Sequence, residues 1–298
     1  MTTAAQAARS ETVDDELLKA YLASRPEDYP TPPLNQAAAQ FLDEAFEKKA
    51  TGDGFCTGYY EPELNGVLNR HGPYIHPIYR KPPDLTPDRP YHDRKAISDG
   101  ALNGQGLELA WLRDPVEAFF LHIQGSGRVR LDNGQVMRVG FAGKNGHAYR
   151  SIGKILVERG LFALEDVTAQ ALKDWLADHP EDAERLMNEN SSYVFFDARP
   201  QLTETDGPIG TAGVPLTLLV SVAADPQHHP LGSLIHIEHH PATGLKNGYA
   251  IVQDTGGAIK GAGRIDLFTG SGDEAGDLAG ALKHPVRVTT FAPRKAPT

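Results

Sequence analysis

Two carboxylates flank a glycine-rich run near the C-terminal end of the chain. The segment reads Asp254-Thr-Gly-Gly-Ala-Ile-Lys260-Gly-Ala-Gly-Arg264-Ile-Asp266, and strand-like apolar residues lie at both of its ends. Two strands joined by a glycine turn can deliver both carboxylates to one place, and glycines 256, 257, 261 and 263 permit close backbone approach beside them. Proton transfer by a carboxyl group, next to space for a long substrate, is the chemistry that this pattern favours.

The same run also has a simpler interpretation. Asp254 could cap a turn by accepting hydrogen bonds from nearby backbone amides, and Asp266 could form a surface ion pair with Arg264 or Lys260. Aspartate and glycine are common in turns, so this segment by itself leaves both interpretations open.

A second cluster is Thr57-Gly-Tyr59-Tyr60-Glu61-Pro62. Adjacent residues of a strand point to opposite faces, so we expect one tyrosine to be in the core. The other offers the flat apolar surface with a polar tip on which sugar rings stack, although packing is the commoner use of such a side chain. Glu61 is a candidate second carboxylate.

Two further polar clusters could bind ligand groups. Gln124-Gly125-Ser126-Gly127 follows apolar residues 119–123, which we expect to be a strand, and its amide and hydroxyl suit hydrogen bonding to sugar hydroxyl or N-acetyl groups. It lacks the glycine two positions before the serine that a serine-hydrolase elbow requires. The run from Lys144-Asn145 to Arg150 is expected to open a helix, where an anion can bind. A satisfied loop and a solvated helix cap are the alternatives.

Histidines crowd one region, but we expect no metal and no cofactor. His236, Glu238 and His240 would share one face of a strand, as zinc ligands can. Prolines 230 and 241 bracket the region at expected turns, and neither an HExxH pattern nor a cysteine pair is present. An intact dinucleotide or phosphate-loop glycine pattern is also missing from the sequence.

Composition limits the class of protein. The chain has 298 residues, enough for two domains, and its net charge of −10 disfavours binding to nucleic acid. The single cysteine, Cys56, allows no intrachain disulfide. Residues 1–10 show neither a basic leader nor an anchor cysteine, and no apolar run approaches the roughly 20 residues that span a bilayer, so we expect a soluble chain.

Periodicity and turn residues predict the elements that position these clusters. Helices are expected over residues 16–22, 33–50, 148–159, 168–178 and 180–190. Strands are expected over residues 55–64, 74–81, 117–124 and 193–197, in a hairpin around Asn133-Gly134, and over residues 216–223, 233–238, 249–253, 265–268 and 286–291. The C-terminal third is therefore predicted to be all β, after a linker at residues 201–214. The simplest arrangement is a β barrel completed by both ends of the chain around an αβ insertion.

Taken in order, these clusters resemble the membrane-bound lytic murein transglycosylase A family. The resemblance covers about four-fifths of the chain and rests on motifs that run from Phe55-Cys-Thr-Gly-Tyr-Tyr60 and Pro77-Ile-Tyr-Arg80, through Gln124-Gly-Ser-Gly127, residues 142–154 and Tyr193-Val-Phe-Phe196, to the run that ends at Asp266. It implies a mainly β protein with some helix: a double-psi β barrel formed by residues 1–104 and 206–298, an inserted β-rich α/β domain at 105–205, and a groove between them for a glycan strand.

The resemblance also implies a reaction and a set of site residues. Asp225, Asp254 and Asp266 fall at the three aspartates of the family's C-terminal domain, and Asp266 matches its catalytic acid. The expected reaction cleaves the β-1,4 bond between N-acetylmuramic acid and N-acetylglucosamine without water and forms a 1,6-anhydro end. The residues expected to bind the substrate are Asp254, Tyr60, Thr57, Gln124, Gly125, Ser126, Lys144, Asn145 and Lys260.

For this role Asp266 must be protonated at rest, so we expect partial burial in the groove to raise its pKa, with Asp254 as a neighbouring charge or a hydrogen-bond acceptor. Direct contact with Lys260 or Arg264 would oppose that role. The resemblance implies a periplasmic location, because the family is normally lipid-anchored in the outer membrane and faces the periplasm. This sequence departs from the family in lacking the leader and anchor cysteine, so we expect membrane association only through an anchor that is absent from it. The expected partners are peptidoglycan strands, with cell-wall synthesis and divisome proteins as further candidates, and no nucleic acid.

The sequence leaves two other functions open. A hydrolase on the same barrel would pair Asp266 with a second carboxylate, Asp254 or Glu61, to activate water. A peptidoglycan-binding protein without catalysis would keep the aromatic and amide groups but would not depend on Asp266.

Overall fold

The computed structural model describes residues 15–27, 29, 41 and 44–294 and divides into two compact units. The first contains both ends of the chain, Met1–Tyr60 and Glu204–Thr298, and the second is the inserted segment Glu61–Thr203. The mainly β class and the insertion agree with the expectation from sequence. The expected boundary at residue 104 is wrong, because residues 61–104 belong to the inserted unit and its sheet includes residues 63–67 and 76–79.

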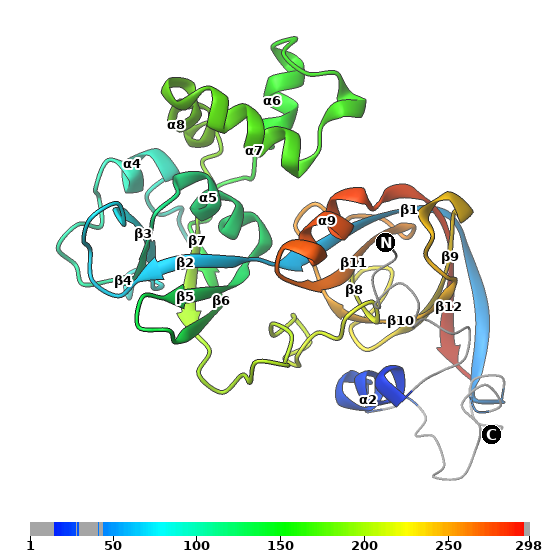
Figure 1. The fold of residues 1–298 in the computed structure, drawn as a ribbon. Coiled ribbons are helices and arrows are strands. Elements are labelled where there is room, and N and C mark those ends of the chain that lie inside the picture. Colours follow the sequence, from blue (N-terminus) through cyan, green and yellow to red (C-terminus); the bar gives the residue numbers. More distant parts are fainter. Residues whose placement is uncertain (1–14, 28, 30–40, 42–43, 295–298) are drawn as a thin grey trace. The chain divides into compact units, whose positions relative to one another are not determined.

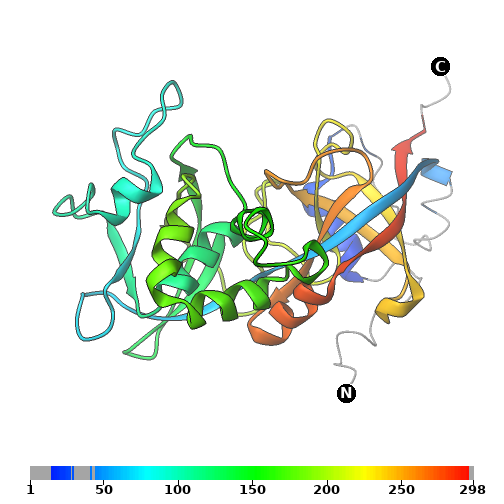
Figure 2. The same ribbon diagram turned by 90° about the horizontal axis from the view of Figure 1, so that it is seen from above.

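The core of the first unit is a closed barrel. Its strands follow the order β1-β11-β8-β10-β9-β12, and β12 pairs with β1 to close the ring. Figures 1 and 2 show β1 running beside β12, the last strand of the chain. The strands are β1 (Phe46–Glu61), β8 (Ser221–Ala224), β9 (Leu234–His239), β10 (Gly248–Asp254), β11 (Arg264–Ser271) and β12 (Lys283–Pro293).

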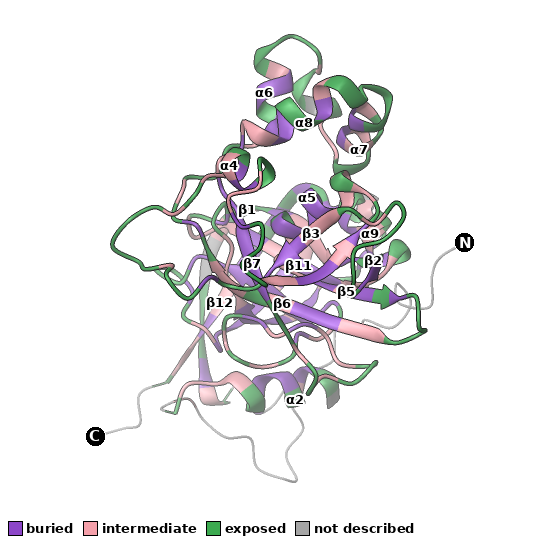
Figure 3. Ribbon diagram, turned by 90° about the vertical axis from the view of Figure 1, so that its left-hand side faces the viewer, coloured by how far each residue is buried: buried purple, intermediate pink, exposed green. Residues whose placement is uncertain are grey.

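Alternation along the strands fills the barrel with apolar side chains. On β12, residues 284, 286 and 288 are buried and residues 283, 285 and 287 are exposed, as a half-buried strand requires. Val288 lies in one cluster with Ile237, Val252 and Leu267 from three other strands. The purple segments in Figure 3 mark such buried positions.

Helices α2 (Asp15–Ser24) and α9 (Asp273–Ala281) complete this unit, together with the short helix η2 (Pro241–Thr243). The sequence predicted the helix at residues 16–22, and α2 packs Leu17 and Tyr21 into a cluster with Phe46 and Phe291. It missed α9, so the expectation of an all-β C-terminal third is wrong. Two glycines, Gly276 and Gly280, hid the helical pattern, although Asp273 and Glu274 supply the acidic first turn that favours a helix.

The expected helix over residues 33–50 is also wrong at its C-terminal end. Residues 30–40, 42 and 43 lie outside the described part of the chain, but Phe46–Ala50 form the start of β1. Each of these residues has a partner on β12, from Phe46 opposite Pro293 to Ala50 opposite Thr289. Pairing with a strand at the far C-terminal end of the described chain overrides the local helical spacing.

The inserted unit contains a six-stranded sheet in the order β3-β4-β2-β5-β6-β7. Its strands are β2 (Glu63–Val67), β3 (His76–Tyr79), β4 (Glu108–Leu112), β5 (Ser126–Leu131), β6 (Val136–Lys144) and β7 (Val194–Ala198). Its helices are α4 (Arg94–Ser98), α5 (Pro115–Gln124), α6 (Ile152–Glu158), η1 (Leu164–Asp166), α7 (Ala169–Asp178) and α8 (Pro180–Asn188). The sequence did not predict α4 or β4.

Several local signals in this unit were correct. Gly134, with φ of 84°, turns the chain between β5 and β6, which pair antiparallel as the Asn133-Gly134 signal predicted. Thr168 caps α7 by accepting a hydrogen bond from Ala171 N, and Pro180 begins α8. Helix α6 begins later than expected, at Ile152 behind the cap Ser151.

The predicted strand at residues 117–124 is wrong, because these residues form α5. The side chain of Asp114 caps the helix through Val116 N, Pro115 occupies the first turn, and Gly125, with φ of 80°, ends it. These three residues are typical helix start and stop signals, and they are present in the sequence. The run of five buried residues from Ala118 to His122 resembled a buried strand because α5 is covered on several sides.

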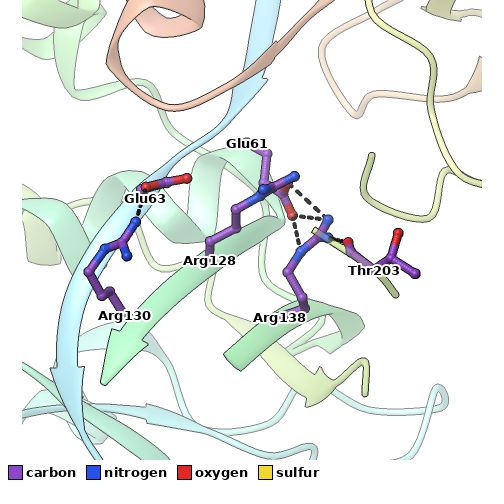
Figure 4. Close-up of polar contacts among 6 residues, drawn as sticks. All are labelled: Glu61, Glu63, Arg128, Arg130, Arg138 and Thr203. Atoms are coloured by element: carbon purple, nitrogen blue, oxygen red, sulfur yellow. Dashed lines mark hydrogen bonds and ion pairs between the residues drawn. The ribbon is translucent and has the colours of Figure 1, made fainter. Parts of the chain in front are cut away.

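Arg138 joins the two ends of the inserted unit. Its Nη2 donates to both oxygens of Glu61 at 2.8 and 3.0 Å, and its Nη1 donates to the carbonyl of Thr203 at 2.8 Å (Figure 4). Arg128 Nε donates to the same carboxylate at 2.8 Å. Glu61 and Thr203 are the first and last residues of the unit, so this buried cluster holds the entering and leaving chain together.

We expect Glu61→Gln to destabilise the protein by about 3 to 5 kcal/mol, because it leaves the buried Arg138 and the nearly buried Arg128 without their anion. Glu63→Gln is the matched control: its pair with Arg130 is exposed and should contribute less than about 1 kcal/mol. Urea unfolding monitored by circular dichroism measures both. Equal effects of the two substitutions would contradict this role of Glu61.

Candidate active site

Asp266 lies near the start of β11, and a residue from the other end of the chain holds one of its oxygens. Thr57 Oγ1, on β1, donates to Asp266 Oδ1 at 2.5 Å. The two residues are 209 positions apart in the sequence, and barrel closure places their strands side by side. Among the described residues, no hydrogen bond reaches Oδ2, so this oxygen is available to a substrate.

Arg264 reaches Asp266 through Thr57. Its Nη2 donates to Thr57 Oγ1 at 2.8 Å and its Nη1 to the Ile265 carbonyl at 2.5 Å, while the guanidinium lies 5.8 Å from the ring centre of Phe55. Within the described part of the chain, neither Arg264 nor Lys260 forms a direct ion pair with Asp266. The direct contact that would have opposed an acid role is therefore not seen there.

The pKa of Asp266 is raised above its ordinary value. Burial is the largest cause, because it disfavours the charged form, and the negative charge of Asp254 acts in the same direction. The hydrogen bond from Thr57 and the positive charge of Arg264 oppose the rise. The expected direction and its cause, burial, are confirmed, and Asp254 acts as a neighbouring charge.

Asp254, at the end of β10, is held at both oxygens. Its Oδ1 accepts from Thr211 N at 3.0 Å and Thr211 Oγ1 at 2.8 Å, and its Oδ2 accepts from Tyr59 OH at 3.1 Å. Burial and the two aspartate charges raise the pKa of Tyr59 well above its usual value, so its hydroxyl stays a neutral donor. Thr211 was not predicted to have a role, because it lies in the stretch of residues 201–214 that we expected to be a linker.

The two tyrosines of the Tyr59-Tyr60 pair have different surroundings. The Tyr59 ring packs 5.5 Å from that of Phe268, and its hydroxyl is committed to Asp254. The Tyr60 ring lies against Gly276 of α9, where an added Cβ would come within 3.0 Å of it. Tyr60 is half-buried, so part of its ring remains accessible. Glu61, the next residue, is bound by two arginines, which argues against its use as a second catalytic carboxylate.

The glycines between the two aspartates do not all leave open space. A Cβ at Gly263 would lie 2.8 Å from the backbone of Gly54, and one at Gly256 would meet Ile259 at 2.6 Å. Gly257 and Gly261 do face open space. Gly263 therefore serves the approach of β1, whose Phe55 N donates to the Gly263 carbonyl at 2.9 Å.

Asp225 fixes the same glycine turn. It is buried immediately after the last residue of β8, and its oxygens accept from Gly261 N at 2.8 Å and Gln227 N at 3.2 Å. These backbone hydrogen bonds are the main reason why its pKa is lowered. Lys260 is exposed on the turn beside it. The three aspartates thus have distinct environments, which their spacing in the sequence did not reveal.

The remaining predicted binding residues lie in the inserted unit. Gln124 ends α5, Gly125 is its left-handed cap, and Ser126 begins β5; Gln124 and Ser126 are partly exposed. Lys144, at the end of β6, is exposed.

Asn145 is different, because its side chain is buried and used within the protein. Its Nδ2 donates to the carbonyls of His92 and Ser191, and its Oδ1 accepts from Tyr193 N at 2.8 Å. The expectation that Asn145 binds substrate is not supported by this geometry. Moreover, the polar run does not open a helix, because α6 begins only at Ile152.

A cavity of about 640 Å³ lies elsewhere in the inserted unit. Arg94 and His122 line it, and the Arg94 guanidinium donates to the carbonyls of Asn190 and Ser192 and contacts the rings of Phe119 and Tyr193. Burial lowers the pKa of Arg94 to about 10. None of the sequence-predicted site residues lines this cavity.

Comparison with known proteins gives matches to two family models. The model described as MltA specific insert domain matches residues 55–197, and the model described as 3D domain matches residues 220–292. In the described residues, no helix has the length and apolar character needed to cross a membrane.

Individual relatives agree with these matches. The membrane-bound lytic murein transglycosylase A of Vibrio cholerae is 37% identical over 260 residues, which is 83% of this chain and 67% of that protein. That of Escherichia coli K12 is 37% identical over 242 residues, 78% of this chain and 64% of that protein. The chain thus spans about two thirds of the length of these relatives.

Solved structures give the same result. A membrane-bound lytic murein transglycosylase from Agrobacterium tumefaciens superposes with a TM-score of 0.82 at 31% identity, covering 93% of this chain and 92% of that one. Escherichia coli MltA with bound chitohexaose has a TM-score of 0.75 at 31% identity, covering 87% of this chain and 79% of that one.

The opposite pKa shifts of two aspartates predict opposite effects of removing their charge. A raised folded-state pKa favours folding at low pH, and that contribution is lost as the pH rises from about 3.9, the unfolded value, through the folded pKa. We therefore expect the Asp266→Asn variant to unfold at a higher urea concentration than the parent chain at pH 7. The difference between the two urea midpoints should become smaller toward pH 4.

Asp225→Asn is the control with the other sign. Because its pKa is lowered in the folded state, its charge stabilises the fold above the unfolded pKa, so this substitution should destabilise the protein at pH 7 and less so on acidification. Urea titrations at several pH values measure both. A destabilising Asp266→Asn at pH 7 would refute the assignment of a raised pKa.

Proposed function

Because this chain belongs to the membrane-bound lytic murein transglycosylase A family and is a peptidoglycan lytic transglycosylase, we propose that Asp266 is its single catalytic acid and base. The observation that carries the proposal is the environment of this carboxyl group. Its pKa is raised by burial, one oxygen is fixed by Thr57, and the other has no donor among the described residues.

The reaction needs a proton twice, in opposite directions. Cleaving the β-1,4 bond between N-acetylmuramic acid and N-acetylglucosamine requires a proton on the leaving oxygen, which protonated Asp266 donates through Oδ2. The resulting carboxylate then accepts the proton of the muramyl C6 hydroxyl, whose oxygen attacks C1 and closes the 1,6-anhydro ring. Asp266 returns to its protonated form, and no water is consumed.

The neighbours of Asp266 support both protonation states. Burial and the Asp254 charge favour the neutral acid that begins the cycle. The Thr57 hydrogen bond, backed by Arg264, stabilises the carboxylate that exists between the two proton transfers. Influences in both directions suit a group that acts first as acid and then as base.

A hydrolytic mechanism needs a second carboxylate that can activate water. Asp254 is a poor candidate, because hydrogen bonds from Thr211 and Tyr59 already occupy both of its oxygens. Glu61 is bound by two arginines. We therefore favour the anhydro-forming reaction over hydrolysis, with Asp254 as a supporting residue.

The glycan contacts remain part of the proposal. Tyr60 and Lys260 in the first unit, and Gln124, Gly125, Ser126 and Lys144 in the second, are accessible or partly accessible polar and aromatic groups of the kind that bind sugars and their acidic substituents. The chitohexaose bound by the related structure supports a carbohydrate ligand. The names of the relatives place them at a membrane, and we propose that this chain acts on peptidoglycan from the periplasmic side.

We expect Asp266→Asn to lower turnover of purified murein sacculi by roughly 10²- to 10⁴-fold, because an amide can neither donate nor accept the proton as a carboxyl group does. Asp277→Asn, the same chemical change on the exposed face of α9, should keep normal activity. Mass spectrometry of the released muropeptides measures the rate and distinguishes anhydro from reducing ends. Near-normal cleavage by Asp266→Asn, or reducing ends as the main product, would reject the proposal.

Thr57→Val tests the environment of the acid. Loss of the hydroxyl removes a hydrogen bond that lowers the pKa of Asp266, so that pKa should rise further. Because the starting acid must be protonated, the alkaline limb of the pH dependence of kcat/KM should move to higher pH. Activity assays across the pH range measure the limb. A limb that stays in place, or moves to lower pH, is inconsistent with Asp266 as the acid.

A further inference from the structure

A thiol and two imidazoles lie close together inside one end of the barrel. They have no part in the catalytic proposal. One ligand atom from each of Cys56, His239 and His284 lies within 4.8 Å of the others, and all three residues are buried. His239 Nδ1 and His284 Nε2 are 3.1 Å apart. Among the described residues, these three side chains form a group that could hold a metal ion.

The strand register explains why they meet. Cys56 on β1 is directly opposite His284 on β12, and His239 on β9 is opposite Val286, two residues along the same face of β12. The three ligands therefore come from three adjacent strands and point into the barrel. The sequence directed attention to His236, Glu238 and His240 instead. His236 and Glu238 lie on the other face of β9 from His239, and His240 follows the end of the strand.

We propose that Cys56, His239 and His284 form a binding site for one thiophilic metal ion, and that Cu⁺ is the ion it prefers. Two neutral imidazole nitrogens and one thiolate are the donors that soft and borderline ions select. Their spacing requires only side-chain rotations, because ligands of one such ion lie roughly 3.3 to 3.9 Å apart when bond lengths are about 2.0 to 2.3 Å.

A second observation supports a ligand at this place. His284 is only 8% exposed, and its Nδ1 atom is buried without a hydrogen-bond partner among the described residues. Buried polar atoms are nearly always satisfied in folded proteins. Ring reorientation at a metal ion would let one nitrogen bind the ion.

Charge balance favours Cu⁺ over Zn²⁺. Metal binding breaks the S–H bond of Cys56, releases that proton to solvent and forms a metal–thiolate bond. The thiolate and Cu⁺ sum to zero charge, whereas Zn²⁺ would leave one positive charge among Val286, Val288 and Ile237 in an apolar core. Three donors also suit the low coordination number of Cu⁺, while a structural Zn²⁺ site normally has four.

A metal ion at this site would link β1, β9 and β12, the strands at which the barrel closes. A ligand that binds only the folded state stabilises it by mass action, so Cu⁺ should raise the thermal unfolding temperature of the full chain. Cys56 precedes Thr57, whose side chain faces Asp266, so the ion would lie on the opposite face of the strand that carries the hydrogen-bond partner of the catalytic acid.

The test is anaerobic titration of the purified full chain with Cu⁺, using competition with a chromogenic Cu⁺ chelator, and a parallel titration with Zn²⁺. We expect one Cu⁺ per chain, an increase of several degrees in the unfolding temperature, and an X-ray absorption spectrum with one sulfur and two nitrogen neighbours. Cys56→Ala and His284→Gln should each weaken Cu⁺ binding at least 100-fold, whereas His228→Gln, at an exposed position of the same unit, should not.

Circular dichroism and thermal unfolding of the metal-free variants establish that they fold, so a loss of binding can be assigned to the lost ligand. The proposal is overturned if folded Cys56→Ala binds Cu⁺ as the parent chain does. It is also overturned if the parent chain binds no Cu⁺, or if Zn²⁺ binds more tightly than Cu⁺.

Discussion

Closure of the barrel between β1 and β12 is the constraint on which the rest of the first unit depends. It joins residues near the start of the described chain to its last strand, from Phe46 opposite Pro293 to Thr57 opposite Lys283. Once β1 is held there, its inward face contributes Cys56 to the core and its other face presents Thr57 to Asp266. Gly54 and Gly263 permit this arrangement, because a side chain at either position would collide with the other's backbone.

The chemistry of Asp266 follows from a balance that the barrel maintains. Burial and a neighbouring carboxylate raise its pKa, while a hydroxyl hydrogen bond and a guanidinium lower it. Both pairs of influences are needed, because the catalytic group must hold a proton, lose it and regain it. The first pair favours the neutral acid and the second favours the carboxylate. The three aspartates of this unit illustrate the point, since backbone amides lower the pKa of Asp225 and hydrogen bonds from Tyr59 and Thr211 hold Asp254.

The inserted unit depends on a different interaction. Arg138 binds Glu61 and Thr203, the residues at which the chain enters and leaves the unit. A long insertion between two barrel strands leaves two chain ends that must lie close together, and a buried ion cluster with several hydrogen bonds fixes them. This also explains why Glu61, beside the two tyrosines, looked catalytic in the sequence but serves the fold.

The sequence by itself determined the class of fold, most of the short-range elements and the identity of the candidate acid. Signals that act within a few residues, such as Asn133-Gly134 and the Thr168 cap, were reliable because their causes are local. Predictions from sequence failed where contacts with distant residues decide the structure. Phe46–Ala50 form a strand because they pair with β12, and α5 resembled a strand because it is covered on several sides. Residues 61–104 belong to the inserted unit and not to the barrel unit. Only the tertiary structure decided which oxygen of Asp266 is held, that Arg264 acts through Thr57, and that Cys56 meets two histidines. The physical reason is that hydrogen bonds, burial and charge act over a few ångströms in space, and a linear sequence does not record those distances.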